Sequence, residues 1–573
     1  MAVENLITEH IDIWTSAVKT RSTSGRGSSK KLELYGIKKL RKLILELAVH
    51  GKLVPQDPND EPADILVQRI MAKKKELLAD GTLKKAKKSK VHDAIISAEE
   101  LPLGWVAADF GDITFNLDAQ RIPLSVSERK GRQGIYDYYG ASGVIDSIDA
   151  YLFDKPLLLI GEDGANLVNR STPIAFMARG KYWVNNHAHV IDGISEDFLI
   201  YLSLYINSIS LIPYITGMAQ PKMNQAKMNS ILVLLPPEKE QHRIVAKVDE
   251  LMTLCDQLEQ QTEASIEAHQ VLLTTLLDTL TNSADADELM KNWARISEHF
   301  DTLFTTEESI DQLKQTILQL AVMGKLVPQD PNDEPASELL KRIAEEKAQL
   351  VKEKKIKKQK VLPPISEDEK PFELPSGWEW CRFGSLFKSF SNGLYKPAKF
   401  YTDAGVISLR MYNIQDGKID FEGAKRVEVE PNELEQFLLE KGDLLINRVN
   451  SKELVGKTAI IPQLDEPLVY ESMNMRAKPF TNYLSAEYLN LFMMTALAQQ
   501  SISSFAKEAI GQASINQGQV SSMAIPLPTF NEQKRIVLKI NELLVICEEL
   551  KARLKESQTT QLLLTDAIVE QAV

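Results

Sequence analysis

"GKLVPQDPNDEPA" occupies residues 51–63, and the same thirteen letters return at residues 324–336. With two differences the match extends to 45–63 and 318–336. A match of this length does not arise by chance, so part of the chain is duplicated. Glycine followed by prolines, aspartates and asparagine stops a helix and favours turns. Each copy is therefore predicted to end a helix and to form a fixed corner between a helical support and the segment that follows.

The duplication continues far beyond the thirteen residues. "MNQAKMNSILVLLPPEKEQHRIV" (223–245) aligns with "INQGQVSSMAIPLPTFNEQKRIV" (515–537), whereas residues 106–222 and 379–514 have almost nothing in common. A repeated frame with divergent inserts is expected of two binding heads on matched supports. A duplicated enzyme domain would repeat its catalytic residues inside the inserts, and no such residues are repeated.

Helical periodicity marks the supports. Residues 35–49 and 309–322 read as helices that end at the thirteen-residue corners, and a helix over about 238–281 follows the first insert. Apolar residues of the two later helices step by three and four, as in a coiled-coil seam. Because both copies carry this seam, we expect the two helices to pack against each other; packing of each helix on its own domain is the alternative. The seam residues are Ile244, Val248, Leu251, Cys255 and Leu258 in the first copy and Ile536, Ile540, Leu543, Cys547 and Leu550 in the second.

The inserts themselves have mixed patterns. Short apolar runs that end in polar loops, at 151–167 and 439–449, predict buried strands. Residues 193–207 and 484–500 read as capped helices. Both inserts are therefore expected to be mixed α/β heads.

Length and composition describe an ordinary globular chain. The 573 residues are 44% hydrophobic and 25% charged. A chain of this length is too long to fold around one hydrophobic core. No apolar run approaches the roughly 20 residues of a membrane span. Three cysteines are too few for a disulfide framework, and their spacing fits no zinc site. We expect a cytoplasmic protein with no membrane partner.

The net charge of −12 conceals two basic arms. Residues 70–90 carry eight lysines against two acids, and residues 341–360 carry nine bases against three acids. The lysines from Lys84 to Lys90 and from Lys352 to Lys360 would suit DNA phosphates. A solvated linker is an equal alternative for both arms.

Catalytic, nucleotide and metal motifs are lacking. "SKELVGKT" (451–458) ends like a phosphate-binding loop, but a serine replaces its first glycine. "IGEDGAN" (160–166) lacks the spacing of a calcium loop. His187 and His189 have a spacing that could bind metal, but no third ligand is near in sequence, so ordinary packing is favoured. The methyltransferase tetrad D/N-P-P-Y/F and a glycine-rich methyl-donor loop are missing, so no catalytic and no metal residue is predicted.

The order frame–head–frame–head–frame resembles the specificity subunit of type I restriction–modification enzymes over essentially the whole chain. The resemblance is carried by "YYGASGVIDSIDAYLFDKPLLLIGEDGANLV" (138–168), "GMAQPKMN" (217–224), "IGQASIN" (510–516) and the two helix starts. The long N-terminal extension that ends in the thirteen-residue corner resembles the type IB branch.

The resemblance implies an α+β protein with two mixed α/β target recognition domains. Duplicated long antiparallel helices, coiled-coil-like, would join these domains in a pseudo-two-fold internal repeat. The expected division is a helical region with a basic arm at 1–100, the first recognition domain at 101–236, a central helical region with a basic arm at 237–373, the second recognition domain at 374–528 and a C-terminal helix at 529–573.

The same resemblance implies the function. Each head would read one half of a bipartite, asymmetric double-stranded DNA target, and the helices would set the spacing between the halves. They would also dock two modification (methyltransferase) subunits and, through them, two restriction subunits. S-adenosylmethionine, ATP and magnesium would be bound by those partners, and this chain would bind no cofactor. The assembled complex would methylate adenine N6 and cleave DNA with ATP.

Candidate DNA-contacting residues are the polar and basic side chains of head loops. About half of them are expected to be solvated or bonded internally instead. Glutamine, lysine and asparagine residues at matched places in the two copies are expected to hold a loop or to touch phosphate. The candidates are Arg121, Arg129, Lys130, Arg132, Tyr138, Gln220, Lys222 and Asn224 in the first head, and Asn392, Lys396, Lys399, Arg410, Asn413, Arg448, Asn450, Lys452, Gln512 and Asn516 in the second.

Two other functions are compatible with parts of this pattern. The heads could bind proteins, with the helices as a stalk, and such an adaptor would not show the steep salt dependence of DNA binding. A fused methyltransferase with a degenerate motif would transfer methyl groups as an isolated chain.

Overall fold

The computed structural model describes residues 3–21, 31–85, 101–217, 220–284, 286–509 and 511–572. The chain forms two compact units. Unit 1 comprises Met1–Ser265 together with Ser557–Val573, and unit 2 comprises Ile266–Glu556. Each unit therefore contains the first part of one long helix, α10 (Glu238–Thr281) or α19 (Phe530–Ala572), and the last turns of the other.

The support of unit 1 is helical. The seam of α10 and the apolar stripe of α3 belong to the same hydrophobic core, and Ile568 and Val569 near the end of α19 pack against this core. Tyr35 on α3 donates a hydrogen bond to Asp566 at 2.8 Å, which ties the two helices together. The elements are α1 (Val3–Glu9), α2 (Ile11–Ser16), β1 (Lys19–Arg21), β2 (Lys31–Glu33), α3 (Tyr35–Val49) and α4 (Ala63–Ala79).

The thirteen-residue segment is the corner between support and head. Gly51 ends α3 with φ +68°, in the left-handed region that a side chain disfavours. From the same segment, the Gln56 amide donates to Glu240 on α10 at 3.1 Å. The Trp105 indole N–H, at the entrance to the head, donates to the other oxygen of Glu240 at 3.0 Å. One buried carboxylate thus joins corner, head and long helix, as the sequence predicted.

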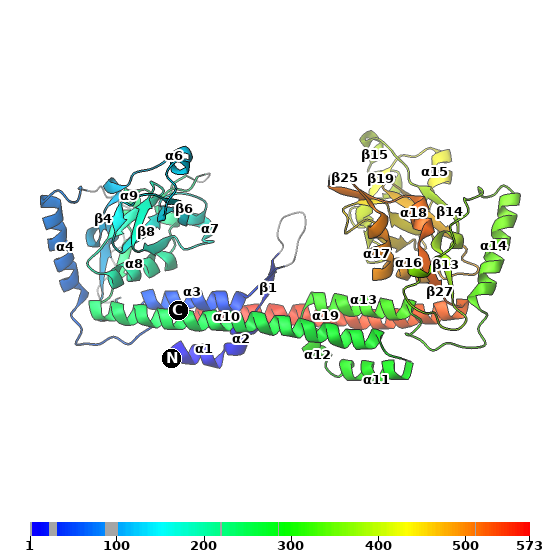
Figure 1. Ribbon diagram of the computed structural model, residues 1–573, viewed down its shortest axis with the longest axis horizontal. Coiled ribbons are helices and arrows are strands. Elements are labelled where there is room, and N and C mark those ends of the chain that lie inside the picture. The colour runs from blue at the N-terminus through cyan, green and yellow to red at the C-terminus, as the bar shows by residue number, and fades with distance from the viewer. Residues whose placement is uncertain are drawn as a thin grey trace. The chain divides into compact units, whose positions relative to one another are not determined.

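The first head is built on two four-stranded sheets among its described residues, of order β6-β5-β10-β7 and β4-β11-β8-β9. A two-stranded pair, β12-β3, closes the head beside the start of α10. Helix α8 packs on β8 and β9 and also against α3, so it connects head and support (Figure 1). The elements are β3 (Val106–Asp109), α5 (Phe110–Ile113), β4 (Phe115–Asn116), α6 (Val126–Lys130), β5 (Tyr136–Gly140), β6 (Gly143–Ile148), β7 (Phe153–Asp154), β8 (Leu157–Gly161), α7 (Asn166–Asn169), β9 (Ala175–Ala178), β10 (Lys181–Val184), β11 (Ala188–Asp192), α8 (Glu196–Ser208), α9 (Gln225–Asn229) and β12 (Leu232–Leu235).

Unit 2 repeats the same support and corner. Gln329 donates to Glu532 on α19 at 3.1 Å, and the Trp378 indole donates to the second oxygen of Glu532 at 2.8 Å. Gly324 ends the support helix with φ +71°. The support elements are α11 (Ala286–Ser297), α12 (Phe300–Leu303), α13 (Glu307–Val322) and α14 (Ala336–Lys352), with the last part of α10 and the first part of α19.

The second head also has two four-stranded sheets in its described part, of order β14-β24-β20-β22 and β15-β19-β16-β23. The pair β13-β27 closes it beside the start of α19. The elements are β13 (Glu379–Arg382), β14 (Phe387–Asn392), β15 (Tyr401–Thr402), β16 (Val406–Leu409), β17 (Ile414–Gln415), β18 (Lys418–Ile419), β19 (Lys425–Val427), α15 (Pro431–Phe437), β20 (Leu444–Asn447), β21 (Val449–Asn450), β22 (Thr458–Ile460), β23 (Leu468–Tyr470), β24 (Asn474–Pro479), α16 (Ala486–Met493), α17 (Ala496–Phe505), β25 (Lys507–Ala509), β26 (Gln512–Ser514), α18 (Gln517–Ser522) and β27 (Ala524–Leu527).

The seams require one correction. All ten predicted seam residues are buried, but those of α10 belong to the core of unit 1 and those of α19 to the core of unit 2. The two long helices pack together as predicted, but each seam meets the far end of the other helix: Ile568 and Val569 of α19 pack on the α10 seam, and Leu273 and Leu277 of α10 share a core with the α19 seam. The two seams therefore do not face each other. Each seam instead shares a core with the shorter support helix of its own unit, α3 or α13.

The basic arms begin on α4 and α14. In the first arm Lys84 and Lys85 follow α4, whereas residues 86–90 lie outside the described residues. The second arm runs from the last turn of α14 into a segment without regular structure. Among the helices that the structure describes, none is long and apolar enough to cross a membrane.

Candidate functional site

Three loops of the first head meet at the end of β8. The Glu162 N–H donates to the His187 carbonyl at 2.8 Å, and the Met223 N–H donates to the Glu162 carbonyl at 2.8 Å. Backbone hydrogen bonds thus fix the loop after β8 to the loop before β11 and to residues 220–224. These are the loops that the sequence singled out as "IGEDGAN" and "GMAQPKMN".

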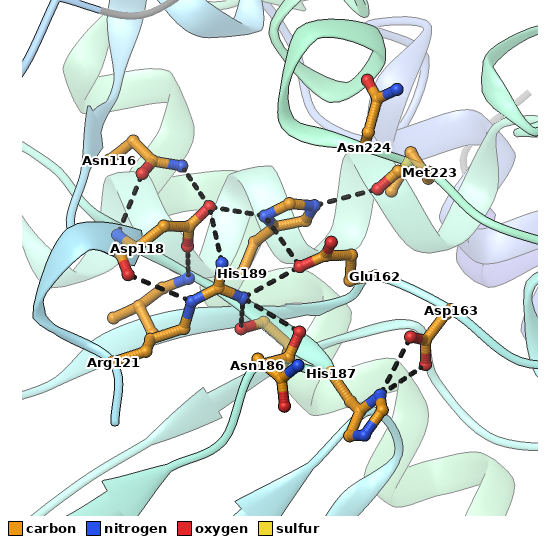
Figure 2. Close-up of polar contacts among 12 residues, drawn as sticks. Asn116, Asp118, Arg121, Glu162, Asp163, Asn186, His187, His189, Met223 and Asn224 are labelled. Carbon is orange, nitrogen blue, oxygen red and sulfur yellow. Dashed lines mark hydrogen bonds and ion pairs between the residues drawn. The ribbon is translucent and has the colours of Figure 1, made fainter. Parts of the chain in front are cut away.

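A network of charged side chains fills the space behind these loops (Figure 2). Arg121 donates to Glu162 at 2.9 Å and to the Ala188 carbonyl at 2.7 Å, and it lies 3.4 Å from Asp118. Lys222 pairs with the second oxygen of Glu162 at 3.1 Å. The two buried acids are therefore compensated from both sides, as buried carboxylates must be.

His189 is the centre of this network. Its ring is 1% exposed, with Nδ1 2.7 Å from Asp118 and Nε2 2.9 Å from the Met223 carbonyl. Both neighbours only accept hydrogen bonds, so both ring nitrogens must donate, which requires the charged imidazolium. Burial opposes this charge, but hydrogen bonding and attraction to Asp118 outweigh burial and raise the pKa of His189. His189 is therefore a packed side chain with both ring nitrogens hydrogen-bonded, and His187 pairs separately with Asp163 at 2.9 Å.

A metal site does not emerge from the cluster. No group of three or more histidine, cysteine, aspartate or glutamate side chains in the described part of the chain is arranged to hold a metal ion. The three cysteines are buried and free, and burial raises the pKa of Cys255 and of Cys547 to about 11.

The second head has the same backbone frame with different side chains. The Arg448 N–H donates to the Met473 carbonyl at 2.8 Å, and the Ile515 N–H donates to the Arg448 carbonyl at 3.0 Å. These bonds match those of Glu162 in the first head, so Arg448 occupies the structural position of Glu162. The charge at this position is therefore reversed between the heads.

Two further equivalences follow from the parallel strand pairs. The Asn185 N–H donates to the Tyr139 carbonyl at 3.1 Å, and the Glu471 N–H donates to the Leu409 carbonyl at 3.0 Å. Glu471 therefore corresponds to Asn185. The residue after Leu409 is Arg410, which corresponds to Gly140 after Tyr139.

Three predicted contacts of the first head lie on or after α6. Arg129 pairs with Asp146 at 2.8 Å and lies over the ring of Tyr138 at 4.9 Å. Arg132 pairs with Asp149 at 2.9 Å and lies over Trp183 at 5.0 Å. Lys130 is exposed. Each arginine is thus paired with an aspartate and covers a buried aromatic ring, which leaves Lys130 as the exposed cation of this group.

Two predicted DNA contacts are corrected by burial. Tyr138 is fully buried, and its hydroxyl accepts the Leu124 N–H at 3.1 Å. Asn413 is fully buried, where its amide donates to the Asp420 carbonyl at 2.8 Å. Both side chains therefore hold turns of their own heads and do not face a ligand in this structure.

The other predicted residues of the second head are spread over several loops. Lys396 pairs with Glu433 at 2.7 Å, and Lys452 pairs with Glu508 at 2.5 Å. Lys399 lies over the Phe400 ring at 5.0 Å. The remaining contacts are those of Asn392 with Gln517 at 3.0 Å, Asn450 with Asn447 at 3.0 Å and Arg448 with the Ser472 carbonyl at 3.1 Å.

The matched residues of the two loops have a structural role. Asn224 accepts the Lys227 N–H at 3.0 Å at the start of α9, and Asn516 accepts the Gln519 N–H at 3.0 Å at the start of α18. Both asparagines therefore cap the short helix that follows their loop. Gln220 and Gln512 are exposed.

Sequence reasoning missed the acids of the sites. Asp118, Glu162 and Glu471 are not among the predicted residues, because basic and amide side chains are the ones expected to contact DNA. Each acid stands beside a predicted arginine in space, but only Asp118 stands near one in sequence. The spacing of Asp118 and Arg121 within one turn was the local sign that could have found this pair.

Comparison with known proteins agrees with this organisation. The family model "Type I restriction modification DNA specificity domain" matches residues 102–268 and 375–557, which cover the two heads and the starts of the long helices. Two Escherichia coli proteins match over their full length and that of this chain: the type I restriction enzyme EcoAI specificity subunit at 42% identity and the EcoEI specificity subunit at 41%. The EcoKI specificity subunit of strain K12 is 23% identical over 53% of this chain and 55% of its own length.

A search of solved structures matched the HsdS subunit from Thermoanaerobacter tengcongensis, at 16% identity and a TM-score of 0.37, over 82% of this chain and 97% of that one. The full-length relatives include the N-terminal extension, in agreement with the expected type IB branch. With two matched domains and two full-length relatives above 40% identity, the chain belongs to the family of type I restriction–modification specificity subunits, which recognise DNA sequence.

Proposed function

We propose that each head reads one half of a bipartite, asymmetric DNA target and that α10 and α19 set the spacing between the halves. The observation that carries this proposal is the pair of matched frames with different side chains. Glu162 and Arg448 hold the same backbone position with opposite charge. Two heads with matched backbone positions but different side chains at those positions would suit two different half-sites.

The long helices would serve as spacer and docking surface. They contain 44 and 43 residues, so each spans on the order of 65 Å at 1.5 Å per residue. At ~3.4 Å per base pair this length corresponds to roughly 19 base pairs, the scale of a gapped site. Two modification subunits would dock on these helices and would bring two restriction subunits with them.

The chemistry would belong to those partners. The chain has none of the sequence motifs of a methyltransferase or an ATPase, and its full-length relatives carry the name of specificity subunits. S-adenosylmethionine, ATP and magnesium would therefore be bound by the modification and restriction subunits. This chain would choose the adenine that its partners methylate.

The deciding experiment is co-expression with the modification subunit, followed by mapping of N6-methyladenine across the host genome. We expect one gapped, asymmetric motif that the modification subunit alone does not produce. If the complex forms and no new motif is methylated, the DNA-reading function is wrong, and heads that bind protein become the better account.

Salt dependence separates the same two functions in vitro. Binding of a duplex to the purified complex should weaken steeply as salt rises, because phosphate contacts release counterions. Lys130, Arg132 and Lys399 are exposed or partly exposed basic residues of the heads that would contribute to this slope. A flat salt response would favour the adaptor.

A further inference from the structure

Arg410 in the second head is held in place by two neighbours. Its guanidinium pairs with Glu471 at 2.8 Å and lies over the Tyr401 ring at 4.6 Å. The Tyr401 hydroxyl donates to the same Glu471 oxygen at 2.5 Å. An arginine fixed by a carboxylate and an aromatic face has lost most of its rotamer freedom before any ligand binds, which favours specific recognition.

The protein does not saturate this guanidinium. An arginine has five N–H donors, and its contact with one carboxylate uses a minority of them. The Nε atom of Arg410 is buried, and no hydrogen-bond partner for it occurs in the described part of the chain. The side chain is 29% exposed, so part of the group faces outward.

The outward part faces an open cavity of about 570 Å³. Arg410 and Glu471 line it together with Tyr401, Lys425 and Tyr395, whose ring is 79% exposed. The cavity thus offers hydrogen-bond donors, two carboxylate acceptors (Glu471 and Asp403) and aromatic side chains. It lies wholly within the second head.

This mixture of charges suits a base pair better than a phosphate. Glu471 would repel a phosphate at short distance, whereas a base edge is uncharged and carries both donors and acceptors. In the major groove guanine presents the acceptors O6 and N7, which arginine binds with two N–H groups, and cytosine presents an N4 amino donor, which a glutamate accepts. The Arg410–Glu471 pair matches both edges of one G·C pair.

The first head lacks this arrangement at the equivalent place. Gly140 stands where the second head has Arg410, and Asn185 stands where it has Glu471. The side chain of Asn185 accepts the His187 N–H at 2.8 Å and is 4% exposed, so it serves the loop. Whatever the pair recognises is therefore specific to the second head.

We propose that Arg410 and Glu471 read a G·C base pair in the half-site of the second head, with Arg410 binding the guanine and Tyr401 positioning the pair. This inference rests on the DNA-reading function proposed above. It adds which base pair one of the heads requires and which side chains impose the requirement.

The test uses the complex with the modification subunit and the methylation map of the wild-type chain. In Arg410→Ala, one G·C position of one half-site should become degenerate while the other half-site keeps its sequence. Affinity for the wild-type site should fall about 5- to 150-fold, the range of a lost bidentate base contact. The matched control is Arg426→Ala, because Arg426 forms a similar pair with Glu466 at 2.9 Å in the same sheet without lining the cavity. Its motif should not change.

A chemical probe identifies the contacted atom. Replacement of guanine by 7-deazaguanine removes the N7 acceptor, so wild-type binding should weaken at one guanine, and Arg410→Ala should not respond to that change. If Arg410→Ala fails to fold, Arg410→Lys can replace it, because lysine keeps the charge but cannot form the bidentate contact. Loss of the 7-deazaguanine response in Arg410→Lys would support the proposal equally.

Three results would overturn the inference. The wild-type motif could lack a G·C pair in both half-sites, or Arg410→Ala could methylate an unchanged motif. Binding of Arg410→Ala could also weaken equally on all duplexes with the 7-deazaguanine response intact, which would indicate a phosphate contact. Absence of any motif in the wild type is a different result and refutes the proposed function itself.

Discussion

At one backbone position the two heads carry opposite charges in different surroundings. In the first head Glu162 is enclosed by Arg121 and Lys222, and the neighbouring His189 has both ring nitrogens bonded. In the second head Arg448 stands at the place of Glu162, with a buried Nε that lacks a hydrogen-bond partner among the described residues. The polar atoms of the first network are hydrogen-bonded to one another, whereas in the second head the Nε atom of Arg448 is buried without such a bond.

The corners of the two units, unlike the heads, have the same side chains and the same contacts. Gln56, Trp105 and Glu240 recur as Gln329, Trp378 and Glu532, with distances that agree within 0.2 Å. If a buried carboxylate loses one of its donors, its oxygen is left without a hydrogen bond and the fold is destabilised. A substitution of any one of the three residues is therefore expected to be unfavourable. The corners that hold head and support together are therefore alike, while the side chains at matched backbone positions of the heads have diverged.

The largest expected effect tests whether the two corners are equivalent. Trp105→Ala should destabilise unit 1 by about 3–5 kcal/mol, because it empties a buried site and removes a donor from Glu240. Trp378→Ala should cost unit 2 about the same. Hydrogen exchange followed by mass spectrometry assigns the loss to one unit or the other. Unequal losses, or loss of protection in both units from either change, would show that the corners are not independent copies.

The saturated network of the first head should be nearly as sensitive. His189→Ala leaves Asp118 buried without its main charged partner, which should cost about 3 kcal/mol. The control is His187→Ala, since His187 pairs with Asp163 in a half-exposed position and its loss should cost under about 1 kcal/mol. Denaturant unfolding of both variants measures the difference. Equal costs would mean that His189 does not act as a buried ion-pair partner.

The site of His189 in the first head should also depend on pH, whereas the equivalent site of the second head should not. The pKa of His189 is raised in the folded state, so its stabilising contribution is complete below the ordinary value of 6.5 and is lost as pH rises through the folded value. Asp118 and Glu162 face the same ring, at 2.7 Å and 3.9 Å from Nδ1, and Arg121 pairs with both acids.

The expected measurement is a difference in stability between the wild type and His189→Gln that narrows as pH rises above 6.5. Protection of loop 220–224 should follow the same curve. In the second head the structural counterpart of His189 is Met475, which does not titrate. A pH-independent difference would contradict the imidazolium.

The smallest effect compares two lysines at the junction of arm and head. Lys74 on α4 donates to the carbonyls of Gly111 and Thr114, the latter at 2.8 Å. Lys347 on α14 donates to the Gly384 carbonyl at 3.2 Å, and burial lowers its pKa to about 8.

Lys74→Met should therefore cost about 1–2 kcal/mol, because two carbonyls lose a charged donor. Lys347→Met should change stability little, since its single bond is long and its charge is disfavoured by burial. Thermal unfolding of the two variants gives the comparison. A larger loss for Lys347→Met would show that the two arms are anchored differently from what these contacts indicate.

The sequence by itself determined what depends on local spacing. The support helix expected at 35–49 is α3 with those bounds, the long helix expected at 238–281 is α10, and the thirteen-residue repeat forms the predicted corners. Helical periodicity and turn composition depend on residues that are close in the sequence. The local sequence is therefore sufficient to predict these helices and turns.

Only the tertiary structure decided which distant residues meet. Asp118 and His189 are 71 residues apart, and their contact depends on which strand ends share an edge of the first head. The burial of Tyr138 and Asn413, and the allocation of each seam to its own core, were decided in the same way. The two inserts have almost no sequence in common, so the equivalence of Glu162 and Arg448 was established only by backbone hydrogen bonds. Backbone hydrogen bonds do not depend on which side chain a residue carries. The backbone positions could therefore stay the same while the side chains at them changed.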